Sequence, residues 1–152
     1  MNNDDFFKLA DAQYELGNLE KAFTLFLDAA ELGDSSAMSR LACMYADGEG
    51  IARNHTKSLE WDLKAIEAGN DSSMLNIGIT YRGLGDMKSS RKWFEKSLEN
   101  GNGEAALQLA KLYMVSDKED ETVRHYLNIA ASHHSICELS REESKEKISQ
   151  IN

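Results

Sequence analysis

The residue types that could bind a metal ion gather near the C-terminal end of the chain. His125, His133, His134 and Cys137 carry imidazole and thiol groups, which are the usual ligands of zinc. Their spacing matches neither an HExxH nor a CxxC pattern, and on a helix the adjacent His133 and His134 would point in different directions. We expect the polar end of a helix here and no metal site. The alternative is a metal-binding or hydrolytic protein that uses His125, His133 and Cys137.

Nucleophilic catalysis and phosphate binding are the other chemistries that the sequence raises. Cys43 would need a base close by, and no histidine lies within a helical turn of it. Gly48-Glu49-Gly50 is a GxG motif, but a phosphate loop of that kind follows a strand, and Asp47 and Glu49 would repel phosphate. We therefore expect no enzymatic activity, no catalytic residues and no cofactor.

The net charge of −9 argues against nucleic acid as a partner, because phosphate binding requires clustered lysine and arginine. Residues 1–34 hold eight acidic and two basic residues, so the acidic excess lies mainly at the N-terminal end. This excess is either a solvated surface or a means of attracting a basic partner.

Membrane and secretory signals are not visible in the sequence. No stretch approaches the roughly 20 apolar residues of a membrane-spanning helix, and the chain does not begin with a basic leader and an apolar segment. Cys43 and Cys137 lie far apart and match no zinc-type spacing. We expect a cytoplasmic protein that makes no membrane contact and keeps both thiols free.

Two kinds of marker residue recur along the chain and reveal an internal repeat. The tyrosines are Tyr14, Tyr45, Tyr81 and Tyr113, at intervals of 31, 36 and 32 residues. The glycines are Gly33, Gly69 and Gly101, and each lies 12 residues before a tyrosine. His134 stands where the next marker glycine would fall. Because the glycine-to-tyrosine interval is constant, it contains the turn between repeats. The variable interval joins the two helices within a repeat.

Apolar residues within each repeat have helical spacing. The positions seven, four and three places before a tyrosine form one buried helix face, and its small member lets a neighbouring helix approach. In the second helices, a bulky residue eight places and a small residue four places before the marker pack together. The first-helix faces are Met38, Leu41 and Ala42; Met74, Ile77 and Gly78; and Ala106, Leu109 and Ala110. The second-helix pairs are Leu25 and Ala29, Trp61 and Ala65, Trp93 and Ser97, and Tyr126 and Ala130.

This spacing predicts two helices per repeat and a final helix that closes the array. Ser140 and Glu143 have the spacing of a capping box for that last helix. The predicted helices are 4–16, 19–32, 35–46, 55–68, 72–83, 87–100, 103–115, 121–133 and 141–150.

The second repeat carries the most specific motif: Leu41-Ala42-Cys43-Met44-Tyr45, Gly48-Glu49-Gly50-Ile51, Lys57-Ser58, Trp61, Lys64-Ala65 and Gly69-Asn70. This motif closely resembles the Sel-one-like repeat family, a branch of the tetratricopeptide-like solenoids, and the other repeats resemble plain tetratricopeptide repeats. The resemblance implies an all-α fold, a right-handed α-α superhelix (solenoid) of four helix-turn-helix repeats plus a C-terminal capping helix. We expect a single domain, 1–152, with repeats at about 4–34, 35–70, 71–102 and 103–134 and a cap at 135–152.

In proteins of the resembled type, the first helices line the concave side of the superhelix. Four residues of this face, Leu75, Ile79, Leu107 and Met114, are apolar although they lie off the core stripe, so they form either a partner site or a buried seam. The candidate partner-binding residues are Glu15, Ser39, Asp47, Leu75, Ile79, Arg82, Leu107, Lys111 and Met114.

The expected function is a non-catalytic protein–protein interaction module that binds a protein or peptide. It would be an adaptor, or an immunity or inhibitor protein for a basic toxin or effector domain. We expect the chain itself to be a monomer or a weak homo-oligomer.

Overall fold

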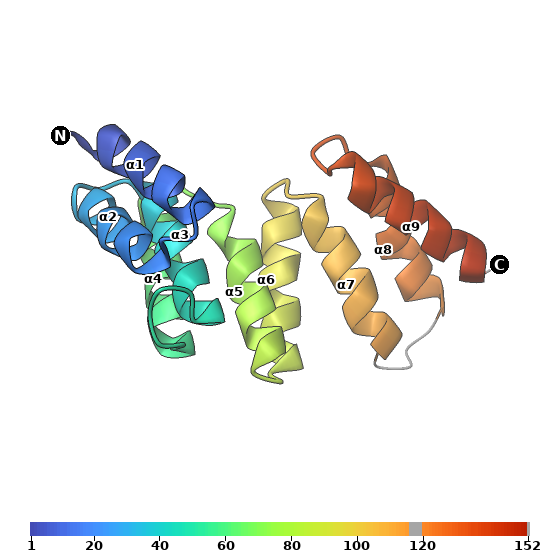
Figure 1. Cartoon of the computed structure of the whole chain (residues 1–152). Coiled ribbons are helices and arrows are strands. Elements are labelled where there is room, and N and C mark those ends of the chain that lie inside the picture. Colours follow the sequence, from blue (N-terminus) through green and yellow to red (C-terminus); the bar gives the residue numbers. More distant parts are fainter. Residues whose placement is uncertain (116–119, 152) are drawn as a thin grey trace. The chain divides into compact units, whose positions relative to one another are not determined.

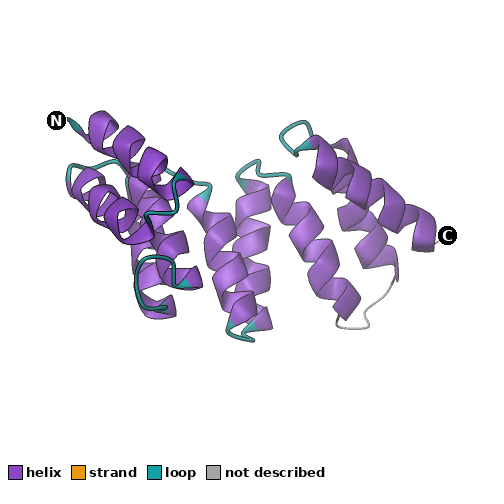
Figure 2. Cartoon of the chain, in the orientation of Figure 1, coloured by secondary structure: helices purple, strands orange, loops and turns teal. Residues whose placement is uncertain are grey.

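The computed structural model describes residues 1–115 and 120–151, without the side chains of residues 3 and 120. In these ranges the chain forms nine α-helices and no strand (Figures 1 and 2). The predicted all-α repeat fold is confirmed, and eight of the nine helices match their predicted bounds to within one residue. The helices are α1 (Asn3–Glu15), α2 (Leu19–Glu31), α3 (Ser35–Asp47), α4 (His55–Glu67), α5 (Ser73–Gly83), α6 (Met87–Glu99), α7 (Glu104–Val115), α8 (Asp120–Ser132) and α9 (Glu138–Ile151).

The chain divides into two compact units, residues 1–80 and 81–152, and the division falls inside α5. In unit 1, α1 packs against α2, α2 against α3, and α3 against α4. In unit 2, α6 packs against α7, α7 against α8, and α8 against α9. Within each unit these helices therefore pack against neighbours in the sequence, as expected of stacked helical repeats.

The predicted small residues and first-helix faces form the centre of each core. Ala29, Ala65 and Ala130 are completely buried, and Ser97 nearly so. Eight of the nine first-helix face residues are buried, and the ninth, Met38, is half-buried and packs against the core of unit 1. The core of unit 1 comprises Ala10, Ala22, Phe26, Ala29, Ala30, Ala37, Leu41 and Met44. The core of unit 2 comprises Ala106, Leu107, Ala110, Val123, Leu127, Ala130 and Ile136.

The prediction for the bulky residues of the second helices was one position out of register. Leu25, Trp61, Trp93 and Tyr126 are only half-buried. The next residue in each helix is completely buried, because one step along a helix turns the side chain by about 100° towards the core. These completely buried residues are Phe26, Asp62, Phe94 and Leu127. Trp61 and Trp93 lie at the edge of the core, each with a lysine ammonium over its ring.

The marker glycines end the second helices as predicted. Gly33, Gly69 and Gly101 have φ values of 93°, 92° and 89°, a left-handed conformation that glycine adopts without a steric penalty. After each of them the next amide donates back to a helix carbonyl, for example from Asp34 to Ala29 at 3.1 Å. The repeats therefore begin at closely similar turns.

The GxG motif belongs to the loop between α3 and α4. Gly50 has a φ of 70°, and a Cβ atom there would collide with the main-chain carbonyl of Leu19 at the start of α2. Tyr14 donates a hydrogen bond to Glu49 at 2.7 Å, which fastens the same loop to α1. The motif thus allows a close backbone contact within unit 1, in agreement with its interpretation as a repeat loop.

The predicted capping box of the last helix is wrong. α9 begins at Glu138, so Ser140 lies inside the helix and cannot be its N-cap. The amide of Cys137 donates to the carboxylate of Glu104 at 3.3 Å, and the amide of Arg141 donates to the carbonyl of Cys137 at 3.0 Å. Contacts with α7 therefore start the helix one turn earlier than the local sequence indicates.

Candidate functional site

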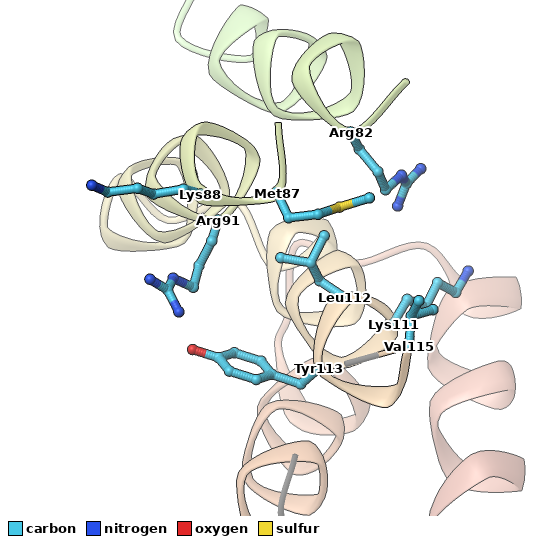
Figure 3. Close-up of a pocket in the computed structure, with 8 residues that line it drawn as sticks. All are labelled: Arg82, Met87, Lys88, Arg91, Lys111, Leu112, Tyr113 and Val115. Carbon is cyan, nitrogen blue, oxygen red and sulfur yellow. The ribbon is translucent and has the colours of Figure 1, made fainter. Parts of the chain in front are cut away.

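Unit 2 contains a pocket of about 630 Å³ on its surface, formed by the end of α5, the start of α6 and the second half of α7 (Figure 3). Asp86 begins α6 as its N-cap, since its carboxylate accepts hydrogen bonds from the amide and the hydroxyl of Ser89 at 3.0 and 2.6 Å. This cap places Met87 and Lys88 in the first turn, beside α7. The lining residues are Arg82, Met87, Lys88, Arg91, Lys111, Leu112, Tyr113 and Val115.

The floor of the pocket is apolar and partly open to solvent. Met87 is 46% exposed and Val115 is 83% exposed, while Leu112 and Tyr113 are half-buried. The ring of Tyr113 stacks on that of Tyr126 in α8, with a centroid distance of 5.7 Å. Exposed apolar side chains around a concave surface are typical of binding sites for proteins or ligands.

The other four lining residues are cationic, and the fold holds three of them with contacts of its own. Arg82 donates a hydrogen bond to the side chain of Gln108 at 2.6 Å and lies over the Phe94 ring. Arg91 is 3.9 Å from the Glu95 carboxylate, and Lys111 is 2.9 Å from the Glu143 carboxylate. Neither Arg82 nor Lys88 forms an ion pair with any carboxylate that the structure describes. The pocket thus presents positive charge, although the chain as a whole is acidic.

The structure brings two of the predicted partner-binding residues, Arg82 and Lys111, into this pocket. Met114, next to the pocket residue Tyr113, is 40% exposed. Of the two alternatives for Leu107, the buried one is correct and its place among the candidate partner-binding residues is wrong, because Leu107 is 1% exposed and belongs to the core of unit 2. It points inward because α8 and α9 cover that side of α7.

The remaining predicted residues lie in unit 1 and outside this pocket. Glu15 and Asp47 are exposed, Ile79 is 40% exposed and Leu75 is half-buried. The hydroxyl of Ser39 accepts hydrogen bonds from Ser73 at 3.0 Å and from Asn76 at 3.1 Å, so it takes part in contacts inside the unit.

Sequence reasoning missed the contribution of α6 to the pocket. The candidate residues were taken from the first helix of each repeat, whereas Met87, Lys88 and Arg91 lie in a second helix. A signal was present in the sequence, because a methionine and two cations fall within one turn and a half of a predicted helix start. The sequence did not show that this turn meets the end of α7.

A second unusual feature is a buried polar cluster in unit 1. Asp62 is completely buried, and its Oδ1 atom accepts a hydrogen bond from Asn76 at 3.4 Å, whereas Oδ2 has no partner among the described residues. Burial raises the pKa of Asp62 to about 7, and the side-chain amide of Asn76 and the nearby hydroxyl of Ser73 act in the opposite direction. Burial also raises the pKa of Cys43 to about 11. Cys43 is therefore a neutral thiol at physiological pH, not an activated nucleophile.

The adjacent histidines near the C-terminal end lie at the end of a helix, as predicted, but just outside it. α8 ends at Ser132, so His133 and His134 lie beyond the helix, and their rings stack with centroids 4.8 Å apart. The Nδ1 atom of His133 is 2.9 Å from the hydroxyl of Ser135. Nowhere in residues 1–115 and 120–151 do three His, Cys, Asp or Glu side chains lie close enough to hold a metal ion. The alternative based on His125, His133 and Cys137 gains no support from this geometry.

Comparison with known protein families identifies the repeats. Residues 10–20, 16–34 and 35–70 match the Sel1 repeat, and residues 71–100 match a tetratricopeptide repeat. The chain therefore belongs to the Sel1-type, tetratricopeptide-like helical repeat proteins. Repeats of this type typically mediate protein–protein interactions.

Two curated relatives share parts of their sequences with this chain. One is the ERAD-associated E3 ubiquitin-protein ligase component HRD3A of Arabidopsis thaliana, 37% identical over 71 residues, which cover 45% of this chain and 10% of that protein. The other is an exopolysaccharide production negative regulator of Rhizobium leguminosarum bv. viciae, 26% identical over 131 residues, which cover 74% of this chain and 49% of that protein. The chain thus spans half or less of the length of these relatives.

Solved structures with the same fold include a Sel1 repeat protein from Oxalobacter formigenes, with a TM-score of 0.75 and 22% identity. That likeness covers 99% of this chain and 70% of the other. A protective antigen of uropathogenic Escherichia coli with an SLR fold also gives a TM-score of 0.75, at 23% identity, over 99% of this chain and 33% of the other. At these identities the likeness establishes the fold alone. Among the described residues, no helix has the length and apolar character needed to cross a membrane.

Proposed function

We propose that the chain is a non-catalytic module that binds a segment of another protein in the pocket of unit 2. The observation that carries this proposal is a set of exposed apolar side chains with cationic side chains on both sides of them. Covering a surface of this kind with a complementary partner lowers the free energy of the system. The membership of the chain in a class of repeat proteins that typically bind other proteins supports the same function.

The composition of the pocket favours binding over catalysis. None of its eight lining residues is a histidine, cysteine, aspartate or glutamate, so the lining offers neither an imidazole or carboxylate base nor a thiol nucleophile. Tyr113 is the only lining residue with a hydroxyl group, and its ring is packed on Tyr126. The lining is therefore suited to recognition by shape and charge.

Within this function we propose the role of an adaptor. The Arabidopsis relative is a ligase component and the Rhizobium relative is a negative regulator, and both descriptions suit proteins that act through other proteins. A second candidate is an inhibitor or immunity protein for a basic toxin domain, which the acidic excess in residues 1–34 favours. Copurification with one basic partner at a fixed stoichiometry, lost when acids of residues 1–34 are neutralised, would favour that second candidate.

The test of the binding module removes the apolar contacts of the pocket without changing its charge. The pocket variant combines Met87→Gln and Val115→Gln, at positions 46% and 83% exposed. The control combines Leu63→Gln and Leu139→Gln, at positions 45% and 81% exposed and outside the pocket lining. We expect proteins captured by the wild type to be retained by the control and lost from the pocket variant. Partners that the pocket variant retains in full would contradict the proposal.

A further inference from the structure

We propose that the pocket of unit 2 recognises an acidic peptide segment, with one large apolar side chain on its floor and carboxylates on both sides of that side chain. This inference rests on the proposed function and specifies the chemistry of the bound segment. It differs from the basic partner that the net charge of the chain suggests, because the local charge of the pocket is opposite to the net charge.

The charge of the lining favours carboxylates in the bound segment. Four of the eight lining residues are cations and none is acidic. Arg91 and Lys111 have the carboxylates of Glu95 and Glu143 beside them, whereas Arg82 and Lys88 have no ion-pair partner in the part of the chain that the structure describes. An approaching carboxylate would therefore meet Arg82, which forms no ion pair among the described residues, and Lys88, whose charge acts on the nearby Asp86 carboxylate without forming an ion pair with it.

The placement of the cations indicates an extended segment with charges on both sides of its anchor. In Figure 3, Met87 and Leu112 occupy the middle of the pocket, with Lys88 and Arg91 on one side of them and Arg82 and Lys111 on the other. A fatty acid carries its charge at one end only, so it would leave one side of the pocket unpaired. A peptide with acidic residues before and after an apolar residue satisfies both sides.

Two of the contact residues are already held in place by the fold. Arg82 is held by the side chain of Gln108 and by the face of Phe94, and Tyr113 is held by Tyr126. Side chains that are ordered before binding lose little conformational entropy when a ligand arrives. The volume of about 630 Å³ lies within the usual range of ligand sites and accommodates a leucine or tryptophan anchor.

The test uses fluorescence anisotropy with the full chain and short labelled peptides. The probe has one tryptophan with aspartates on both sides. The comparison peptides replace the aspartates with lysines, or the tryptophan with alanine. We expect the probe to bind, both comparison peptides to bind at least about tenfold more weakly, and the affinity for the probe to fall as sodium chloride rises from about 0.05 to about 0.5 M. Equal or tighter binding of the lysine peptide would overturn the proposal.

A pair of matched charge reversals locates the binding site. Lys88→Glu changes an exposed lysine of the pocket in the first turn of α6, and Lys21→Glu changes an exposed lysine in the first turn of α2. Both variants change the net charge equally, so long-range attraction falls by a similar amount in the two. We expect about a tenfold loss of probe affinity for Lys88→Glu and less than about a twofold loss for Lys21→Glu. Equal losses in the two variants would contradict a local site.

Three further results would distinguish the possible failures. If cellular partners depend on Met87 and Val115 but the acidic probe does not bind, the inference fails and the proposed function stands. If no partner depends on the pocket, the proposed function itself fails. Displacement of the probe by a fatty acid at comparable affinity, or self-association that Lys88→Glu abolishes, would assign the pocket to a different occupant and overturn the inference.

Discussion

Asp62 in α4 and Phe94 in α6 occupy the same position relative to their marker glycines, and both side chains are completely buried. Phe94 lies in unit 2 with the guanidinium of Arg82 over its ring, whereas Asp62 lies in a polar cluster of unit 1 with Asn76 as a hydrogen-bond donor. The repeat therefore determines how deep this position lies. The neighbouring side chains determine which chemistry the position tolerates.

The two units also differ in where their unusual polarity is found. Unit 1 keeps a carboxylic acid inside, among Ser39, Ser73 and Asn76. The described part of unit 2 buries only serines among its polar side chains, and it displays apolar and cationic side chains together on its surface. A partner can reach the second arrangement and cannot reach the first, so we assign recognition to unit 2.

The largest expected effect comes from replacing Phe94 of unit 2 with aspartate, the residue at the equivalent position of unit 1. Phe94→Asp removes a completely buried ring and buries a carboxylate that has Arg82 as its one nearby cation, so it should lower the free energy of unfolding by about 3–4 kcal/mol. Urea denaturation followed by circular dichroism measures the loss, with Phe94→Leu as the control of similar character. A loss below about 1 kcal/mol would mean that the position tolerates a carboxylate in either unit.

Asp62→Asn should change how stability depends on pH. The pKa of Asp62 is about 7 in the folded chain and near the ordinary aspartate value of 3.8 when unfolded, so the folded state retains the proton while the unfolded state loses it. Wild-type stability therefore falls as the pH rises from about 4 to about 7, by up to about 4 kcal/mol. The variant cannot ionise at this position. It should match the wild type near pH 4 and be more stable above pH 7.

Urea denaturation of both proteins across this pH range tests the prediction. Cys43, in the same cluster, has a pKa of about 11 and stays neutral throughout, so it adds no slope of its own. Other titrating groups are common to both proteins and cancel in the difference. Parallel pH profiles would show that Asp62 ionises in the folded chain as easily as in water.

A smaller effect is expected for the residues one place earlier in the same two helices. Trp61 and Trp93 are half-buried at the edge of the core, with Lys64 and Lys96 over their rings at 4.2 and 4.7 Å. Trp61→Ala and Trp93→Ala should each cost about 1–2 kcal/mol, less than the ~3–5 kcal/mol of a fully buried aromatic residue. Thermal melts of the two variants measure this. A loss above about 3 kcal/mol in either would place that tryptophan in the core.

The smallest effect is expected at the rim of the pocket. Lys111 and Glu143 are 2.9 Å apart, but each side chain is 36% exposed, so solvent screens their interaction. Lys111→Ala should lower the free energy of unfolding by less than about 1 kcal/mol, and the difference should shrink in high salt. Glu143→Ala and the double variant complete a thermodynamic cycle. A coupling energy above about 2 kcal/mol would identify the pair as a structural anchor.

Local signals were sufficient to predict the helices and much of the core. The tyrosine and glycine markers located the repeats, and the apolar spacing placed Leu41, Ile77 and Leu109 in the interior. Helical spacing was less informative at the second helices, where two adjacent bulky residues compete for the core. Leu25 and Phe26 are equally plausible core residues in the sequence, and only contacts with the neighbouring helices show that Phe26 is the deeper one.

The residues of the candidate site were even harder to predict from the sequence than the core residues of the second helices. Arg82 and Lys111 were predicted because they lie on first-helix faces, whereas Met87 and Lys88 lie on a second helix and Leu107 turned out to be buried. The average acidity of the chain also gave no indication of a cationic pocket, because net charge does not report where charges gather.

The sequence by itself determined the class of fold, the number and bounds of most helices and the glycine turns, because these depend on spacing and on backbone conformations that single residues favour. The tertiary structure alone decided that Asp62 is buried, that Leu107 is covered and that four cations line a pocket with an apolar middle. These features depend on which side chains from distant turns of the chain meet, and the distances between helices are not encoded in any local pattern.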